Sequence, residues 1–388
     1  MSKSQAEINK EIALETAKAR GYNSTSDMMG EIRAQLNSDN PQTRALGEEA
    51  ARGAVESLLA LCLKQVFMTE SLPSMYQELV GKTNDGVMYA GNTKTYTVSN
   101  PTGITTYEKT AFIPTGLTTK DLNQFALNMY SNPSSKTLSK WAYKFMKQQT
   151  LEIQEWLPFF KEGTLNTFIS QIQRDIQDVY TLYMYAKVCE IITSESATDD
   201  ANNQAISGKV VNGNATNLFE AWIEVLQHFN YMTQYNKDYN ADQTNKHMYA
   251  ANPEDLLIFV SNKVLTTTRN GILSQTFNAE LMGAESKQLK PENLKTLGKK
   301  ILISENSEGT VLENTQDEWI NDNTIIIVDI SRIKHIVQFD QAGAQFFQKN
   351  VVNYISKNVW GAIAMLPWCK KLIYKNSNLT IAPTQVVR

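Results

Sequence analysis

The chain has 388 residues, of which 42% are apolar and 20% are charged, so it can build more than one packed core. Lysine and arginine number 37 against 40 aspartate and glutamate, and this near-neutral balance argues against a dedicated nucleic-acid-binding protein. The three cysteines are too widely spaced for a disulfide framework or a zinc motif, and no apolar run is long enough for a membrane helix. We expect a reduced protein that folds in the cytoplasm, outside membranes, with no metal ion and no cofactor.

The N-terminal part of the chain has weak helical patterns. Residues 1–20 carry only a narrow apolar stripe, and residues 21–43 are rich in Asn, Ser and Asp. This composition predicts an extended arm with one short helix at 27–36, which gains order mainly by lying on another surface. An amphipathic core helix is predicted at 44–67.

The segment 86–117 changes character and is rich in Thr, Tyr, Val and Ile. Two strands are predicted, at 93–98 and 104–113, joined by a turn at 99–103 into a β-hairpin. The hairpin has few large apolar side chains, and an isolated strand pair is marginally stable in water. We therefore expect it to pack on a neighbouring molecule, through contact residues Tyr96, Val98, Asn100, Pro101, Gly103, Ile104 and Tyr107.

A long helix is the strongest signal in the sequence. Residues 164–194 contain no Pro and no Gly, and apolar side chains recur three or four positions apart, which predicts one continuous helix. At about 1.5 Å per residue such a helix is roughly 45 Å long, more than one compact domain needs. Helical patterns are also predicted at 120–162, where bulky aromatic residues such as Phe145 are expected in the core.

A polar stretch at 195–216 is interpreted as a domain boundary. Asn217 and Glu220 then resemble a capping box ahead of an amphipathic helix. Three short apolar runs predict strands buried on both faces, and together they indicate a mixed α/β unit at 217–340; they are Leu256–Val260, 300–303 and 324–328. The region 336–374 favours β-structure, interrupted by Pro367.

The sequence contains no recognised catalytic motif. His228, His247 and His335 stand in no recognised relation to a nucleophile or to metal ligands, so a solvated or hydrogen-bonded structural role is expected for each. No glycine-rich phosphate-binding motif occurs either. No catalytic, cofactor-binding or metal-binding residue is predicted.

The order of these parts resembles the major capsid proteins of tailed bacteriophages with the Hong Kong 97-type fold. The most sequence-like parts are the run NPEDLLIFVS at 252–261 and the segments 324–330 and 344–360, which look like the closing half of such proteins from small podovirus-like phages of Gram-positive hosts. The resemblance implies an α+β fold with these regions: an N-terminal arm (1–43), a helical segment (44–85), an extended β-hairpin loop (86–117), a peripheral domain (118–216) with the spine helix 164–194, a mixed α/β axial domain (217–340) and a C-terminal β-rich segment (341–388) that returns to the peripheral domain.

The same resemblance implies partners and a location. The chain would assemble with itself into hexamers and pentamers of an icosahedral shell around double-stranded phage DNA, which it would touch through weak non-specific contacts. A separate scaffolding protein and a portal are expected, with assembly in the host bacterial cytoplasm and a final place in the virion capsid. Two alternatives remain: another phage structural component, such as a tail or connector protein, and a cytoplasmic α/β enzyme.

Overall fold

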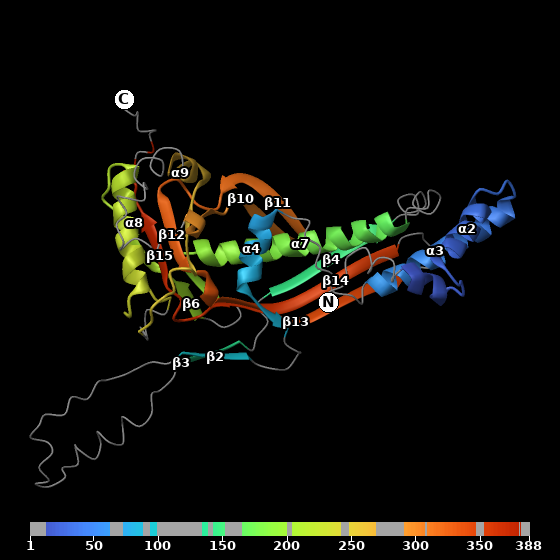
Figure 1. Cartoon of the computed structure of the whole chain (residues 1–388), viewed down its shortest axis with the longest axis horizontal. Coiled ribbons are helices and arrows are strands. Elements are labelled where there is room, and N and C mark those ends of the chain that lie inside the picture. The colour runs from blue at the N-terminus through green and yellow to red at the C-terminus, as the bar shows by residue number, and fades with distance from the viewer. Residues whose placement is uncertain are drawn as a thin grey trace, which may run out of the picture.

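The computed structural model describes residues 13–62, 73–87, 94–98, 134–138, 143–151, 165–199, 204–241, 248–268, 291–306, 309–346, 353–379 and 381. The molecule is elongated, and helix α7 (Leu165–Thr193) runs along its long axis (Figure 1). Helices α2 and α3 lie beyond one end of α7, and a five-stranded sheet lies at the other. The predicted long helix is confirmed, one residue shorter at each end.

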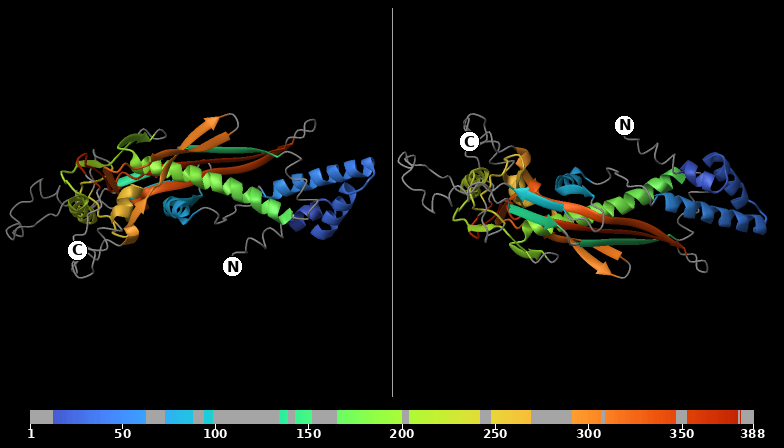
Figure 2. Two further views of the ribbon diagram at one scale, coloured as in Figure 1. Left: turned by 90° about the horizontal axis from the view of Figure 1, so that it is seen from above. Right: turned by 90° about the horizontal axis from the view of Figure 1, so that it is seen from below.

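A six-stranded sheet lies beside α7. Its two longest strands form an antiparallel pair, and Figure 2 shows α7 crossing over them. In spatial order the strands are β1 (Asn84–Val87), β13 (Ile333–Phe346), β14 (Asn353–Met365), β4 (Tyr143–Leu151), β11 (Gly309–Glu318) and β10 (Lys299–Asn306).

Strand β4 corrects the helical prediction for 120–162. It pairs with β14 along its whole length, and Ser134–Leu138 is also a strand, β3. The spacing of bulky residues here suits a helix or a strand, and pairing with a distant strand decides between them. The prediction that Phe145 belongs to the core is confirmed, because it is fully buried against Tyr180 and Tyr183 of α7. The other residues of 120–162 lie outside the described residues.

The second sheet has five strands and its own core. Helix α8 (Leu218–Thr233) packs on it through Trp222, Val225 and Phe229. Two connecting helical elements are α9 (Asn262–Thr267) and the 3-10 turn η4 (Pro291–Asn293), and a second such turn is η5 (Ile330–Arg332). In spatial order the strands are β7 (Lys209–Asn212), β15 (Lys371–Lys375), β12 (Thr324–Asp329), β8 (Leu256–Val260) and β9 (Leu294–Thr296).

Local predictions for this unit hold in most places. Asn217 Oδ1 accepts a hydrogen bond from the Glu220 N–H at 2.9 Å, so the predicted cap of α8 is confirmed. Its reciprocal half differs, because the Glu220 carboxylate accepts from Thr216. Strands β8 and β12 are buried as predicted. The polar boundary itself contains a small hairpin, β5 (Ser196–Asp199) with β6 (Gln204–Ser207).

Strand β10 is a correction. The apolar run 300–303 is a strand, as predicted, but it lies at the edge of the six-stranded sheet and pairs with β11. Ile301 is buried, whereas Leu302 is 44% exposed. Neighbouring residues of a strand point to opposite faces of the sheet. Among the described residues, one face of β10 is therefore buried and the other is open to solvent, whereas both were predicted to be buried.

The N-terminal region is helical where the structure describes it, and the short helix predicted at 27–36 is confirmed. Residues 13–19 are helical, followed by α2 (Thr25–Leu36) and α3 (Pro41–Cys62). Ser24 caps α2, whose buried face packs on α3 of the same chain. The two helices approach closely at Gly47, where a Cβ would lie 2.9 Å from the Gln35 Cβ. The end of the predicted 44–67 helix lies outside the described residues.

The C-terminal region is β-structure, as predicted, and connects the two sheets. Strand β13 runs without a break across the expected boundary at 340/341. Strand β14 ends at Met365, and Pro367 lies in the turn that follows. Strand β15 then joins the five-stranded sheet between β7 and β12, so this segment belongs to both parts of the molecule.

Candidate functional site

The predicted contact loop is held at its base by two strands. Strand β2 (Lys94–Val98) confirms the first predicted strand. Its partner among the described residues is β3 (Ser134–Leu138), with Lys94 opposite Leu138 and Val98 opposite Ser134. The predicted turn at 99–103 lies outside the described residues. The second predicted strand, 104–113, lies outside the described residues.

Among the predicted contact residues, Tyr96 is placed on its own chain. Its half-buried ring packs against Ile336, Ala362 and Ala364 of the six-stranded sheet. Val98 is part of β2, while Asn100, Pro101, Gly103, Ile104 and Tyr107 lie outside the described residues. Tyr96 thus anchors the loop base within the subunit, a role that the sequence did not indicate.

Asp85 is the polar centre of this loop base. Its carboxylate lies 2.6 Å from the Lys94 Nζ and accepts a hydrogen bond from the Tyr96 hydroxyl. Burial acts to raise the pKa of the Asp85 carboxyl, but the hydrogen bonds from Lys94 and Tyr96, with the nearby charge of Lys334, lower it below its ordinary value. Burial and the Asp85 charge together raise the pKa of Tyr96. The carboxylate therefore stays ionised and joins β1 to β2.

We expect Asp85→Asn to loosen the loop base with little effect on the whole fold. The amide keeps the shape but loses the charge that holds Lys94, and an ion pair this close to the surface contributes about 1 kcal/mol or less. Hydrogen exchange should become faster in β2 and β3, while the urea midpoint changes little. Glu313→Gln, which alters an exposed acid on β11, is the control. Unchanged exchange in β2 and β3 would refute this role of Asp85.

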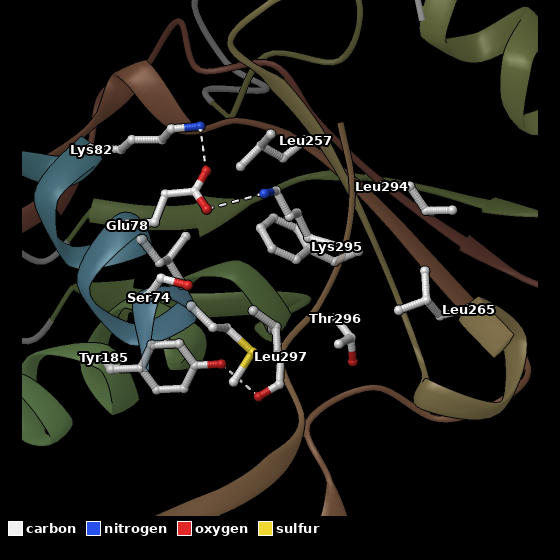
Figure 3. A pocket seen from close by; sticks show the side chains of 13 residues that line it. Ser74, Glu78, Lys82, Tyr185, Leu257, Leu265, Leu294, Lys295, Thr296 and Leu297 are labelled. Carbon is white, nitrogen blue, oxygen red and sulfur yellow. Dashed lines mark hydrogen bonds and ion pairs between the residues drawn. The ribbon is translucent and has the colours of Figure 1, made fainter. Parts of the chain in front are cut away.

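A cavity of about 420 Å³ lies between α4 (Ser74–Thr83), α7 and the edge of the five-stranded sheet (Figure 3). At its rim Glu78 pairs with Lys82 and with Lys295, both at 3.1 Å. Burial acts to raise the pKa of Glu78, but the hydrogen bonds from Lys295 and Lys82 lower it overall. The floor is largely apolar and consists of Leu79, Tyr185, Leu257, Phe259, Leu294 and Leu297.

The polar groups of this cavity are arranged to hold elements of the chain together, and they do not have the arrangement expected for acid–base catalysis. The carboxylate at the cavity, Glu78, is shared by Lys82 and Lys295, and the Tyr185 hydroxyl donates to the Leu297 carbonyl at 2.5 Å. The Glu78–Lys295 pair joins α4 to β9, so it connects the parts built around the two sheets. Neither Glu78 nor Tyr185 is left with the free, positioned proton donor or acceptor that acid–base catalysis needs.

The histidines that the structure describes are held by tyrosines. His228 Nδ1 lies 2.9 Å from the Tyr239 hydroxyl, and His335 Nε2 lies 3.4 Å from the Tyr180 hydroxyl. Burial lowers the pKa of His335 to about 4, so its ring is neutral at physiological pH. His247 lies outside the described residues.

In the described part of the chain, no group of three His, Cys, Asp or Glu side chains is arranged to hold a metal ion. The helices described there are too short or too polar to span a membrane.

Sequence reasoning missed the buried lysines Lys370 and Lys371, which both have fully buried side chains. Lys370 Nζ donates to the Asp238 carbonyl at 3.0 Å and also binds Asn236. Lys371 reaches the end of α7. Their one sequence signal is position, because they directly precede the apolar run Leu372–Ile373–Tyr374 of a buried strand.

No protein-family model and no curated protein matches the sequence. Solved structures do resemble this chain. The capsid structure of Staphylococcus phage Andhra has a TM-score of 0.49 and 11% identity, covering 81% of this chain and 87% of that one. The capsid asymmetric unit of cyanophage A-1(L) has a TM-score of 0.46 and 8% identity, covering 80% and 95%. The mature capsid of bacteriophage PhiM1 has a TM-score of 0.42 and 11% identity, covering 81% and 90%. All three are capsid structures.

Proposed function

We propose that this chain is the major capsid protein of a tailed phage, which self-assembles into hexamers and pentamers of an icosahedral shell. The observation that carries the proposal is the placement of α7. It crosses the six-stranded sheet, where it contacts β4, β10, β11 and β14, and ends on a separate five-stranded sheet (Figures 1 and 2). This layout supports the combination of spine helix, peripheral part and axial part that the resemblance implies.

Surface features of the described residues favour a self-assembling subunit. Phe219 and Ile223, one helical turn apart on α8, are each 46% exposed, and Leu302 on the edge strand β10 is 44% exposed. Exposed apolar side chains and an unpaired sheet edge each favour contacts with other chains. The strand pair β2–β3 and the α2–α3 extension also project from different parts of the body (Figure 1), which suits a subunit with several neighbours.

The chemical content of the described residues favours a structural role over an enzyme. The charged groups at the cavity are paired with one another, and His228 and His335 are held by tyrosines. A tail or connector protein would share this content. We prefer a capsid subunit to a tail or connector protein because of the layout of α7 and the two sheets.

A separate scaffolding protein and a portal would assist assembly in the host bacterial cytoplasm, and the product would be the virion capsid. Packaged double-stranded DNA would meet the inner wall through weak contacts only, because the net charge of the chain is −3.

Electron microscopy and sedimentation of the purified full-length chain test this function. Hexamers, pentamers or closed shells are the expected products. Rings of twelve subunits would indicate a connector instead, and tubes would indicate a tail protein. A uniform monomer that turns over a metabolite would favour the enzyme.

A further inference from the structure

The C-terminal end of α7 is held by a buried lysine from the other sheet. A helix leaves its last carbonyl groups without partners inside the helix. Lys371 Nζ donates to one of them, the Ile191 carbonyl at 2.7 Å, and to the carbonyl of Ser194, the residue after the helix, at 2.6 Å. Lys371 is the first residue of β15, so these bonds tie the long helix directly to the five-stranded sheet. Its positive charge also lies at the negative end of the helix dipole.

The neighbouring strand leaves room for this side chain. Gly208 directly precedes β7, which runs parallel beside β15. A Cβ on Gly208 would lie 2.7 Å from the Lys371 Cγ and 3.1 Å from the Lys371 carbonyl oxygen, closer than carbon atoms pack. The lysine stem therefore occupies the space that a side chain at 208 would need.

The environment of the ammonium group is poor in compensating charge. Glu195 is the nearby carboxylate, but it pairs with Lys375 at 2.5 Å on the more exposed part of the strand. Cys369 also faces the group, and burial raises the pKa of its thiol, which keeps it neutral. Burial lowers the pKa of Lys371 to about 8, against an opposing effect of the Glu195 charge. An apolar side chain of similar length would avoid this cost of burying a charge.

We propose that Lys371 is a positioning residue that fixes the end of α7 on the five-stranded sheet, so that both parts of the subunit keep one relative orientation during assembly. The inference rests on the proposed shell function and adds to it a specific contact, the one between Lys371 and the end of α7. A buried charge that is unfavourable for stability can specify one arrangement among several. Hydrogen bonds to two carbonyl groups at defined positions allow only one placement of the ammonium group. An apolar contact between α7 and β15 would not have this directional requirement.

Hydrogen exchange of the unassembled full-length subunit tests the contact without any shell. In Lys371→Met the amides of residues 190–195 should exchange at least about ten-fold faster than in the wild type, because the Ile191 and Ser194 carbonyls lose the ammonium group that ties them to β15 and the Ile191 carbonyl keeps only the Ser194 hydroxyl. The urea midpoint at pH 7 should not fall, because the buried charge is gone. Lys375→Met is the matched control. It replaces another lysine of β15 and removes that lysine's more exposed ion pair with Glu195, and it should leave the exchange at 190–195 unchanged.

A second variant reaches the same contact from the other side. Gly208→Ala keeps the lysine but displaces its stem, and it should also speed exchange at 190–195. Both variants should form fewer regular shells than Lys375→Met. Unchanged exchange in both variants, or a large loss of midpoint in Lys371→Met, would overturn the proposal. If the wild-type chain forms no shells, the proposed function fails, while the exchange result still decides the role of Lys371.

Discussion

Replacing Phe145 by alanine is expected to lower the free energy of unfolding by about 3–5 kcal/mol. The Phe145 side chain is fully buried between β4 and α7. Its ring centroid lies 5.3 Å from that of Tyr180 and 5.2 Å from that of Tyr183. Truncation leaves a cavity that these rigid rings cannot fill, because the Tyr183 hydroxyl is held by the Lys144 carbonyl at 3.1 Å.

Urea unfolding of the free subunit, followed by circular dichroism, measures this loss. Leu302→Ala is the control, since it also removes a large apolar side chain from the six-stranded sheet, but at a position that is 44% exposed. It should change stability by about 0.5 kcal/mol or less. Equal effects of the two substitutions would mean that α7 does not pack on β4 as described.

The stability of the wild type relative to Lys371→Met is expected to rise as the pH increases from about 8 towards 10.5. Burial lowers the pKa of Lys371 from 10.5 to about 8, so within this window the unfolded chain holds a proton that the folded chain has released. Stability rises with pH wherever the unfolded state binds more protons. The full gain is about 3 kcal/mol, since one pKa unit corresponds to about 1.4 kcal/mol.

The comparison with Lys371→Met isolates this one group. Tyrosines and cysteines also ionise in the window, but they are common to both proteins and cancel in the difference. Urea titrations at several pH values from 7 to 10 give the two free energies. A difference that stays flat, or that falls as the pH rises, would contradict the lowered pKa of Lys371.

The loop base shows where sequence reasoning stopped. A strand at 93–98 was predictable, because Thr, Tyr and Val alternate there. Its pairing was not, because Ser134–Leu138 has no apolar pattern that marks it as a partner. The contact of Tyr96 with Asp85 is also invisible in the sequence, since it depends on β1 and β2 lying side by side near β13. For Tyr96 the structure thus adds a contact within the chain, and its contact with a neighbouring molecule stays a prediction.

By itself the sequence determined the elements whose signal is local. The apolar period of α7, the Asn217 cap of α8 and the apolar runs of β8 and β12 each lie within one short stretch of chain. Only the tertiary structure decided which strands pair, that the helices of the N-terminal region pack on one another, and that β10 lies at a sheet edge. It also decided that Lys371 is buried, because the space beside Gly208 and the carbonyls at the end of α7 come from distant parts of the chain. Local periodicity follows from backbone geometry, whereas pairing and burial depend on which distant surfaces meet.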